Sequence, residues 1–207
     1  MQQRKSTSGA GRAITHLPAN PDGKGASGVL LDWRESTPRG VVAKPQHQLL
    51  AELFTSLLVL SAKFRYKPAI GAANYLYLIE GEWVLSLIAP DEWSDGRHED
   101  FVGTCVLQRD RTWTIRPSER LGEDTPAARA LARFYEAFAE TLDKDGVLED
   151  LLPFHAETLS YYQRMNANAL SRSMRAALTL GDQRAIPLQE WRPLLADIGG
   201  IPLLKAP

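Results

Sequence analysis

Residues 74–89, NYLYLIEGEWVLSLIA, decide the fold class of this chain. Residues 74–80 and 82–89 are predicted to be two short strands, because β-branched and aromatic residues dominate both and a Glu80-Gly81 step separates them. Two further segments of the same character follow at residues 101–108 and 112–116. Four short strands joined in this way predict an antiparallel meander.

The first of these strands is apolar on both of its faces. Tyr75, Tyr77 and Ile79 share one face, because side chains alternate along a strand. Leu76 and Leu78 share the other face. A sheet with two apolar faces needs cover on both sides. We expect one face to pack on a long helix that precedes the sheet, and the other to lie under helices that follow it.

The preceding helix is predicted over residues 46–64. Its apolar side chains recur at helical spacing, at Leu50, Leu53, Phe54, Leu57, Leu60 and Phe64. Pro68 disfavours helical geometry in the residue before it and so ends the segment. The apolar stripe is wide, which predicts that this helix is the central one of its module.

Helical periodicity returns after the strands. Thr125 is a candidate N-cap, with Pro126 at the first helical position. A second helix is predicted over residues 148–180, with Gly181 as its exit and a short helical segment around Trp191 after it. The sequence therefore predicts an α+β fold, with a long helix packed on a small antiparallel four-stranded meander and followed by a C-terminal helical pair.

Composition divides the chain into four parts. Residues 1–44 are rich in Gly, Pro and Ser and are predicted to form a flexible arm, because they cannot bury enough apolar surface to offset their chain entropy. The other parts are a helix-plus-meander module at 45–117, a helical extension at 118–183 and a C-terminal tail at 184–207. Leu30, Leu31 and Trp33 form one apolar patch in the arm, which docks either on the protein's own body, the favoured interpretation, or on a partner.

Charge, cysteine content and hydropathy exclude several classes of protein. The 24 Lys and Arg residues against 25 Asp and Glu give a net charge of -1, so a nucleic-acid or membrane role would need a local patch. Cys105 is the only cysteine, which excludes an internal disulfide and is typical of a reducing cytosol. The most apolar run, residues 53–62, is far shorter than the ~20 residues that cross a bilayer. No apolar signal-peptide stretch follows Met1, so we expect a cytoplasmic protein with no membrane partner.

The polar segment between the second and third strands is the densest group of titratable residues. It holds Asp91, Glu92, Asp95, His98, Glu99 and Asp100. A calcium loop counted from Asp91 would need an acidic ligand at its twelfth position, where Val102 stands. A structural zinc site fails as well, because the chain has one cysteine and four scattered histidines. An acidic solvated loop is the favoured interpretation, with no metal and no cofactor.

His98 could form an acid-base pair with Glu99 or Asp100, because a neighbouring carboxylate fixes the tautomer of an imidazole. The sequence offers no clear nucleophile to act with such a pair. Ser86 lacks the Gly-x-Ser-x-Gly elbow of a nucleophilic serine, and Cys105 lies in a predicted strand. We therefore assign no catalytic residue and favour a His98 that hydrogen-bonds the backbone.

A row of arginines marks the last long helix. Arg164, Arg172 and Arg175 fall in a narrow sector of it, and no acid lies between Thr158 and Gly181. Such a row could meet phosphates or an acidic partner. A solvated helix face is favoured, because the near-neutral total charge does not support nucleic-acid binding.

The central part of the chain resembles a known family. The matching steps are Ile70-Gly71, YLY at 75–77, LSLIAPDEW at 85–93, His98, DFVG at 100–103, Leu107, Asp110 and Thr112-Trp113. Over residues 45–117 they resemble the signature of domain-of-unknown-function family twenty-four fifty-two, an uncharacterised family of bacteria and animals. Glu99 is one residue more than the family pattern has and would shift His98. The resemblance implies a fold module and implies no activity.

Three functions stand as hypotheses. The first is a non-enzymatic cytoplasmic interaction or adaptor module with a protein partner, motivated by the apolar patch of the arm and the aromatic-rich sheet. The second is a small enzyme or ligand-binding protein that uses His98 and the neighbouring carboxylates. The third is nucleic-acid binding through the arginine row. The residues expected at a ligand or partner site are Tyr75, Tyr77, Trp93, His98 and Asp100.

Overall fold

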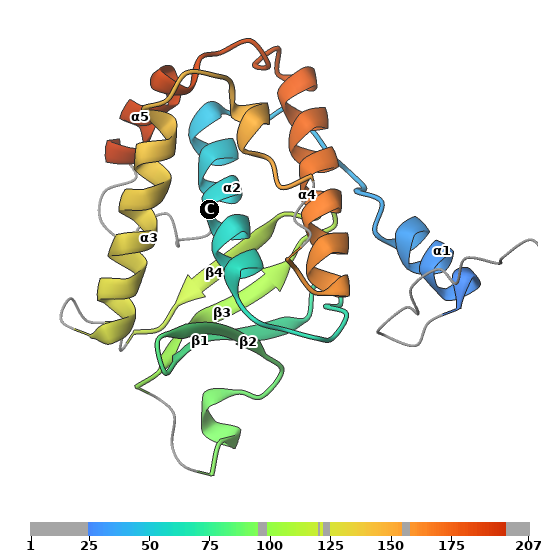
Figure 1. Cartoon of the computed structure of the whole chain (residues 1–207), viewed down its shortest axis with the longest axis vertical. Coiled ribbons are helices and arrows are strands. Elements are labelled where there is room, and N and C mark those ends of the chain that lie inside the picture. Colours follow the sequence, from blue (N-terminus) through green and yellow to red (C-terminus); the bar gives the residue numbers. More distant parts are fainter. Residues whose placement is uncertain (1–24, 95–98, 120, 122–124, 155–157, 198–207) are drawn as a thin grey trace, which may run out of the picture.

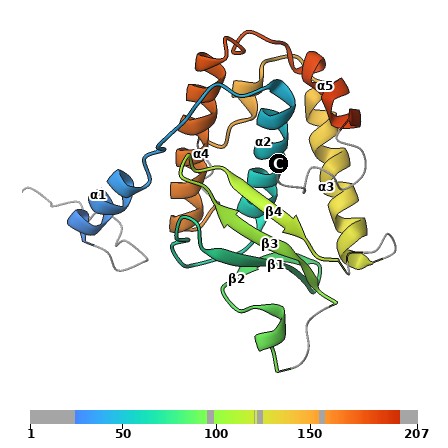
Figure 2. The same ribbon diagram turned by 180° about the vertical axis from the view of Figure 1, so that it is seen from behind.

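Helices gather on one face of a four-stranded antiparallel sheet (Figure 1). The computed structural model describes residues 25–94, 99–119, 121, 125–154 and 158–197. Helix α2 (Gln46–Ser61) lies over the sheet, between α3 (Pro126–Leu142) and α4 (Tyr161–Leu180), as the view from behind also shows (Figure 2). Helix α5 (Leu188–Asp197) packs on α2 and α3. The α+β class and the central position of the first long helix are thereby confirmed.

The sheet has the order β2-β1-β3-β4, and each neighbouring pair is antiparallel. Its strands are β1 (Ala73–Ile79), β2 (Glu82–Ser86), β3 (Phe101–Leu107) and β4 (Trp113–Pro117). The four-stranded antiparallel sheet is confirmed, whereas the sequential order of a meander is wrong. The connection over residues 87–100 is long enough to carry the chain from the edge strand β2 past β1 to the other side of β1.

The C-terminal helices do not cover the second face of the sheet as predicted. They pack around α2, on the face that carries the buried side chains of Leu76 and Leu78 (Figure 1). On the opposite face, Tyr77 is fully buried because the segment after β2 folds back over it. This segment contains a short 3₁₀ helix, η1 (Pro90–Glu92). A loop, and not the predicted helices, therefore covers Tyr77 on this face of the sheet.

The two helices after the sheet begin in different ways. Thr125 caps α3 as predicted, since its hydroxyl accepts a hydrogen bond from the backbone N–H of Ala128 at 3.1 Å. The second helix was predicted from Leu148, where the structure has the 3₁₀ helix η2 (Leu148–Leu151). Helix α4 begins only at Tyr161, because the hydroxyl of Ser160 donates to the carbonyl of Phe64 at 3.0 Å and fixes the start of the helix against the body.

None of the helices within the described residues is long and apolar enough to span a membrane.

Candidate functional site

Helix α1 (Ala26–Glu35) lies beside the N-terminal part of α4, within the segment predicted to be a flexible arm (Figure 1). It docks through its polar side. Asp32 is only 5 % exposed, and its Oδ1 accepts a hydrogen bond from Nζ of Lys67 at 2.7 Å. The hydroxyl of Tyr161 donates to the other carboxylate oxygen at 3.2 Å, and Glu35 also pairs with Lys67. Ion pairs and hydrogen bonds therefore hold α1 in place.

Most of the apolar side of α1 lies in solvent. Leu30 is 69 % exposed, Leu31 is 58 % exposed and Trp33 is 47 % exposed. The guanidinium of Arg172 lies 5.1 Å from the ring centroid of Trp33, a cation–π distance. The helix thus docks on the protein's own body, but the apolar patch that was expected to make this contact stays mostly in solvent.

The turn between β3 and β4 carries the residue that meets the C-terminal end of α1. Arg111 donates a hydrogen bond to the backbone carbonyl of Glu35. The backbone of Arg111 has φ +72°, a left-handed conformation that few non-glycine residues adopt. Two backbone hydrogen bonds close the turn, from Arg111 to the carbonyl of Gln108 at 3.0 Å and from Gln108 to that of Thr112 at 2.9 Å.

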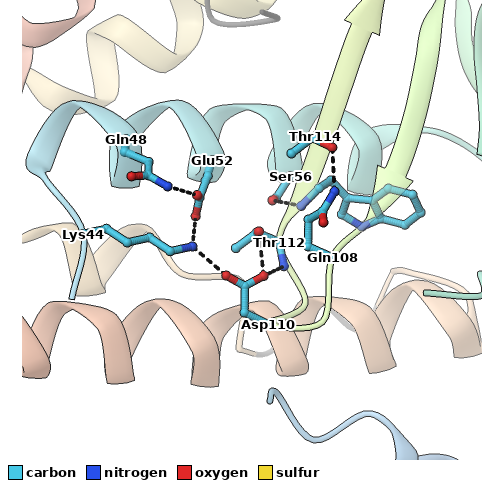
Figure 3. Close-up of polar contacts among 9 residues, drawn as sticks. Lys44, Gln48, Glu52, Ser56, Gln108, Asp110, Thr112 and Thr114 are labelled. Carbon is cyan, nitrogen blue, oxygen red and sulfur yellow. Dashed lines mark hydrogen bonds and ion pairs between the residues drawn. The ribbon is translucent and has the colours of Figure 1, made fainter. Parts of the chain in front are cut away.

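A nearly buried ionic network fixes this turn to the start of α2 (Figure 3). Nζ of Lys44 lies 2.6 Å from a carboxylate oxygen of Asp110 and 2.6 Å from one of Glu52. Oδ1 of Asp110 also accepts hydrogen bonds from Thr112, at 3.1 Å from its backbone N–H and 2.8 Å from its hydroxyl. Asp110 directly precedes Arg111 in the chain, so this network also positions the backbone of Arg111 near the C-terminal end of α1.

The environment shifts the pKa of both partners in the network. Burial alone would raise the pKa of Asp110, but the hydrogen bonds from Lys44 and Thr112 outweigh it and lower that pKa. Burial alone would lower the pKa of Lys44, and the hydrogen bonds to Asp110 and Glu52 reverse this effect and raise it. Both groups are therefore held in their charged forms.

The sheet face opposite the helices carries an aromatic cluster. The ring of Tyr77 lies 5.8 Å from that of Trp93 and 5.5 Å from that of Phe101, and Tyr75 lies 6.2 Å from Phe101. The hydroxyl of Tyr77 donates to the carbonyl of Ile88 at 2.9 Å. The structure thus brings together three of the five predicted site residues, through a phenylalanine that the sequence analysis did not single out. Phe101 lies opposite Tyr77 because β3 pairs with β1, and the predicted meander did not contain this pairing.

The other two predicted residues of that cluster have different outcomes. The backbone carbonyl of Asp100 accepts a hydrogen bond from the N–H of Leu78 at 2.9 Å, which continues the pairing of β1 with β3. His98 lies outside the described residues. Its pairing with a neighbouring carboxylate therefore stays a prediction.

The arginine row on α4 is not a uniformly solvated face. Arg172 lies at Trp33, and its Nη2 is 3.3 Å from the hydroxyl of Ser36. Nε of Arg175 lies 3.7 Å from a carboxylate oxygen of Glu149, and its guanidinium lies 4.6 Å from the ring centroid of Phe154. Arg164 is exposed. Two of the three arginines thus have partners inside the molecule.

Cys105 is fully buried in the core, and burial raises the pKa of its thiol. A thiol in such surroundings packs as a small apolar side chain. Within the part of the chain that the structure describes, no three His, Cys, Asp or Glu residues come close enough together to hold a metal ion.

The protein is an α+β protein. It has a four-stranded antiparallel sheet with helices on one face, and polar contacts hold an added N-terminal helix to this body. Residues 49–136 match a family described as "Protein of unknown function (DUF2452)". The match confirms the resemblance seen in the strands and extends it into α3. It covers the sheet and nearly all of α2, and it leaves α1 outside. No solved structure matches the chain.

Proposed function

We propose that this protein is a non-enzymatic interaction module of the cytoplasm that presents α1 to a partner protein. One observation carries the proposal. The acidic side chain of Asp32 is buried against the body, while the apolar side chains of Leu30, Leu31 and Trp33 are exposed. A surface helix normally buries its apolar side and exposes its charges. The reversed arrangement leaves the apolar side chains of Leu30 and Leu31 free for a second protein, while Trp33 also contacts Arg172.

The chemistry of α1 indicates what the partner presents. An amphipathic helix that docks by its apolar side fits an apolar groove, and burying each anchor side chain there contributes about 1.5–3 kcal/mol. Both acids of α1, Asp32 and Glu35, already pair with Lys67. Arg34 adds an exposed positive charge to the helix. We therefore propose a partner groove that is apolar at its base and rimmed by carboxylates.

A capture experiment with cross-linking tests this proposal. The full chain is compared with the double variant Leu30→Ser/Leu31→Ser and with Leu180→Ser, which changes an equally exposed leucine at the end of α4. The proposal predicts cross-links from residues 26–35 into an apolar groove of one partner, kept in the Leu180 variant and lost in the double variant. Capture that the double variant leaves unchanged would overturn it.

The two alternative functions have less support. An enzyme or ligand-binding protein built on His98 would need a cluster open to a substrate, whereas Tyr77 is buried and its hydroxyl is already bonded to Ile88. Nucleic-acid binding would need a row of free arginines, whereas Arg172 and Arg175 have partners within the molecule.

A further inference from the structure

A cavity of about 380 Å³ lies at the base of α1, next to the β3–β4 turn. Its volume falls within the range of small-molecule sites, roughly 300–1,000 Å³. The charged side chains that line it are Glu35, Arg39, Lys67 and Arg111, and the apolar ones are Pro68, Ala69 and Ile70. Three cations and one acid therefore face a space with an apolar wall.

The three cations that line this cavity differ in the ion pairs and hydrogen bonds that they make. Lys67 is paired with Asp32 and Glu35. Arg39 is exposed, and within the described residues no carboxylate pairs with its guanidinium. The third cation, Arg111, is only 9 % exposed, and its Nε is buried without a hydrogen-bond partner among the described residues. A buried donor left in this state costs free energy. The lining of the cavity by Arg111 and Arg39 places two guanidinium groups, neither with a carboxylate partner in the described part of the chain, beside the same space.

Positive charge accumulates around Arg111. Burial, together with the charges of Arg39 and Arg172, lowers the pKa of Arg111. Like charges are brought this close only at a cost, and an anion between them removes the repulsion. The turn that carries Arg111 is held by the ion pair of Lys44 and Asp110, so the guanidinium is positioned before any ligand arrives.

We propose that this cavity binds a small molecule that carries a phosphate group beside an apolar portion. The guanidinium groups of Arg111 and Arg39 take the phosphate oxygens, because a planar fork of donors matches the geometry of a phosphate. Pro68, Ala69 and Ile70 contact the apolar portion of the ligand. Glu35 is the acid that competes with the ligand for these cations. The inference is independent of the protein partner proposed for α1.

Titration calorimetry of the full chain with phenyl phosphate tests the site. Wild-type protein is expected to bind one equivalent. Arg111→Gln is expected to weaken binding at least tenfold, since a hydrogen bond to a charged group contributes about 1.5–3 kcal/mol. Glu35→Gln keeps the shape of the side chain and removes the competing charge, so binding should tighten severalfold. Arg39→Gln changes an exposed residue, and it should weaken binding about fivefold or more.

A matched control separates a built site from general attraction of anions. Arg34→Gln removes one positive charge from the exposed side of α1, away from the cavity lining, and should change the affinity less than twofold. Absence of saturable binding, or equal weakening by Arg34→Gln and Arg39→Gln, would overturn the proposal. Benzoate that binds as tightly as phenyl phosphate would overturn the assignment to a phosphate.

Discussion

Nζ of Lys67 lies 2.7 Å from Oδ1 of Asp32, a residue 35 positions earlier in the chain. This ion pair joins α1 to the segment that leads into the sheet, and the hydroxyl of Tyr161 adds a contact from α4 at 3.2 Å. Because the pair uses the polar side of α1, it fixes which side of the helix faces solvent. The exposed leucines of the helix are thus a consequence of how it is anchored.

The exposed leucines of α1 should contribute little to folding. We expect Leu30→Ser/Leu31→Ser to change the free energy of unfolding by less than about 1 kcal/mol in total, because surface substitutions away from special features have small effects. The matched control is Leu53→Ala in α2, where the side chain is fully buried and the loss should be about 2–5 kcal/mol. Urea unfolding measures both. A large loss in the α1 variant would mean that these leucines pack on the body.

The buried ionic network should matter far more than an ion pair at the surface. Lys44→Met leaves two nearly buried carboxylates without their cation, and we expect it to lower the free energy of unfolding by about 3 kcal/mol. The exposed pair of Lys63 and Glu82 provides the control, and Lys63→Met should cost less than about 0.5 kcal/mol. Denaturant unfolding of the two variants side by side measures the difference. Equal losses would show that the network does not hold the β3–β4 turn.

Acid should release this network at Asp110. The folded state lowers the pKa of Asp110, so its contribution to stability is complete above the unfolded pKa of roughly 3.9 and is lost as the pH falls through the lower folded value. We expect the unfolding free energy of the wild type to fall more steeply below about pH 4 than that of Asp110→Asn, which has no such proton to take up. Equal slopes in the two proteins would contradict a lowered pKa of Asp110.

The sheet should not tolerate a side chain at Gly103. A Cβ atom at this position would lie 2.6 Å from the backbone carbonyl oxygen of Arg116 in the neighbouring strand, which cannot move without breaking the pairing of β3 with β4. Gly103→Ala should therefore lower the free energy of unfolding by about 1–3 kcal/mol. At Gly25 a Cβ would meet nothing within 4 Å, and Gly25→Ala should leave stability nearly unchanged. Thermal unfolding of the two variants checks the contrast.

Alternation and periodicity predicted the strands well, because these patterns record local burial. The predicted strand at 74–80 and the observed Ala73–Ile79 differ by one residue at each end, and the predicted helix at 46–64 became Gln46–Ser61. The strand order was not predictable in the same way. It depends on where the 14-residue connection over 87–100 takes the chain, and a contact such as Tyr77 with Trp93 is long-range and not periodic.

The errors lie where distant contacts override local pattern. Helix α1 was not predicted, because Gly28 disfavours a helix interior and the ion pair of Asp32 with Lys67 that anchors the helix cannot be seen in a local window. The late start of α4 had a local signal. In the capping-box pattern of Ser160 and Gln163, the side-chain oxygen of Gln163 accepts from the N–H of Ser160 at 3.0 Å.

Hydrogen exchange of the amides in residues 26–35 tests most directly that polar contacts anchor α1. The measurement compares the wild type with Asp32→Asn, Lys67→Met and the double variant. If polar contacts anchor α1, the helix is protected in the wild type, exchange is about tenfold faster in Asp32→Asn and at least as fast in Lys67→Met, and the double variant shows no further increase. Exchange at the same rate in all four proteins, or additive increases in the double variant, would contradict this anchoring.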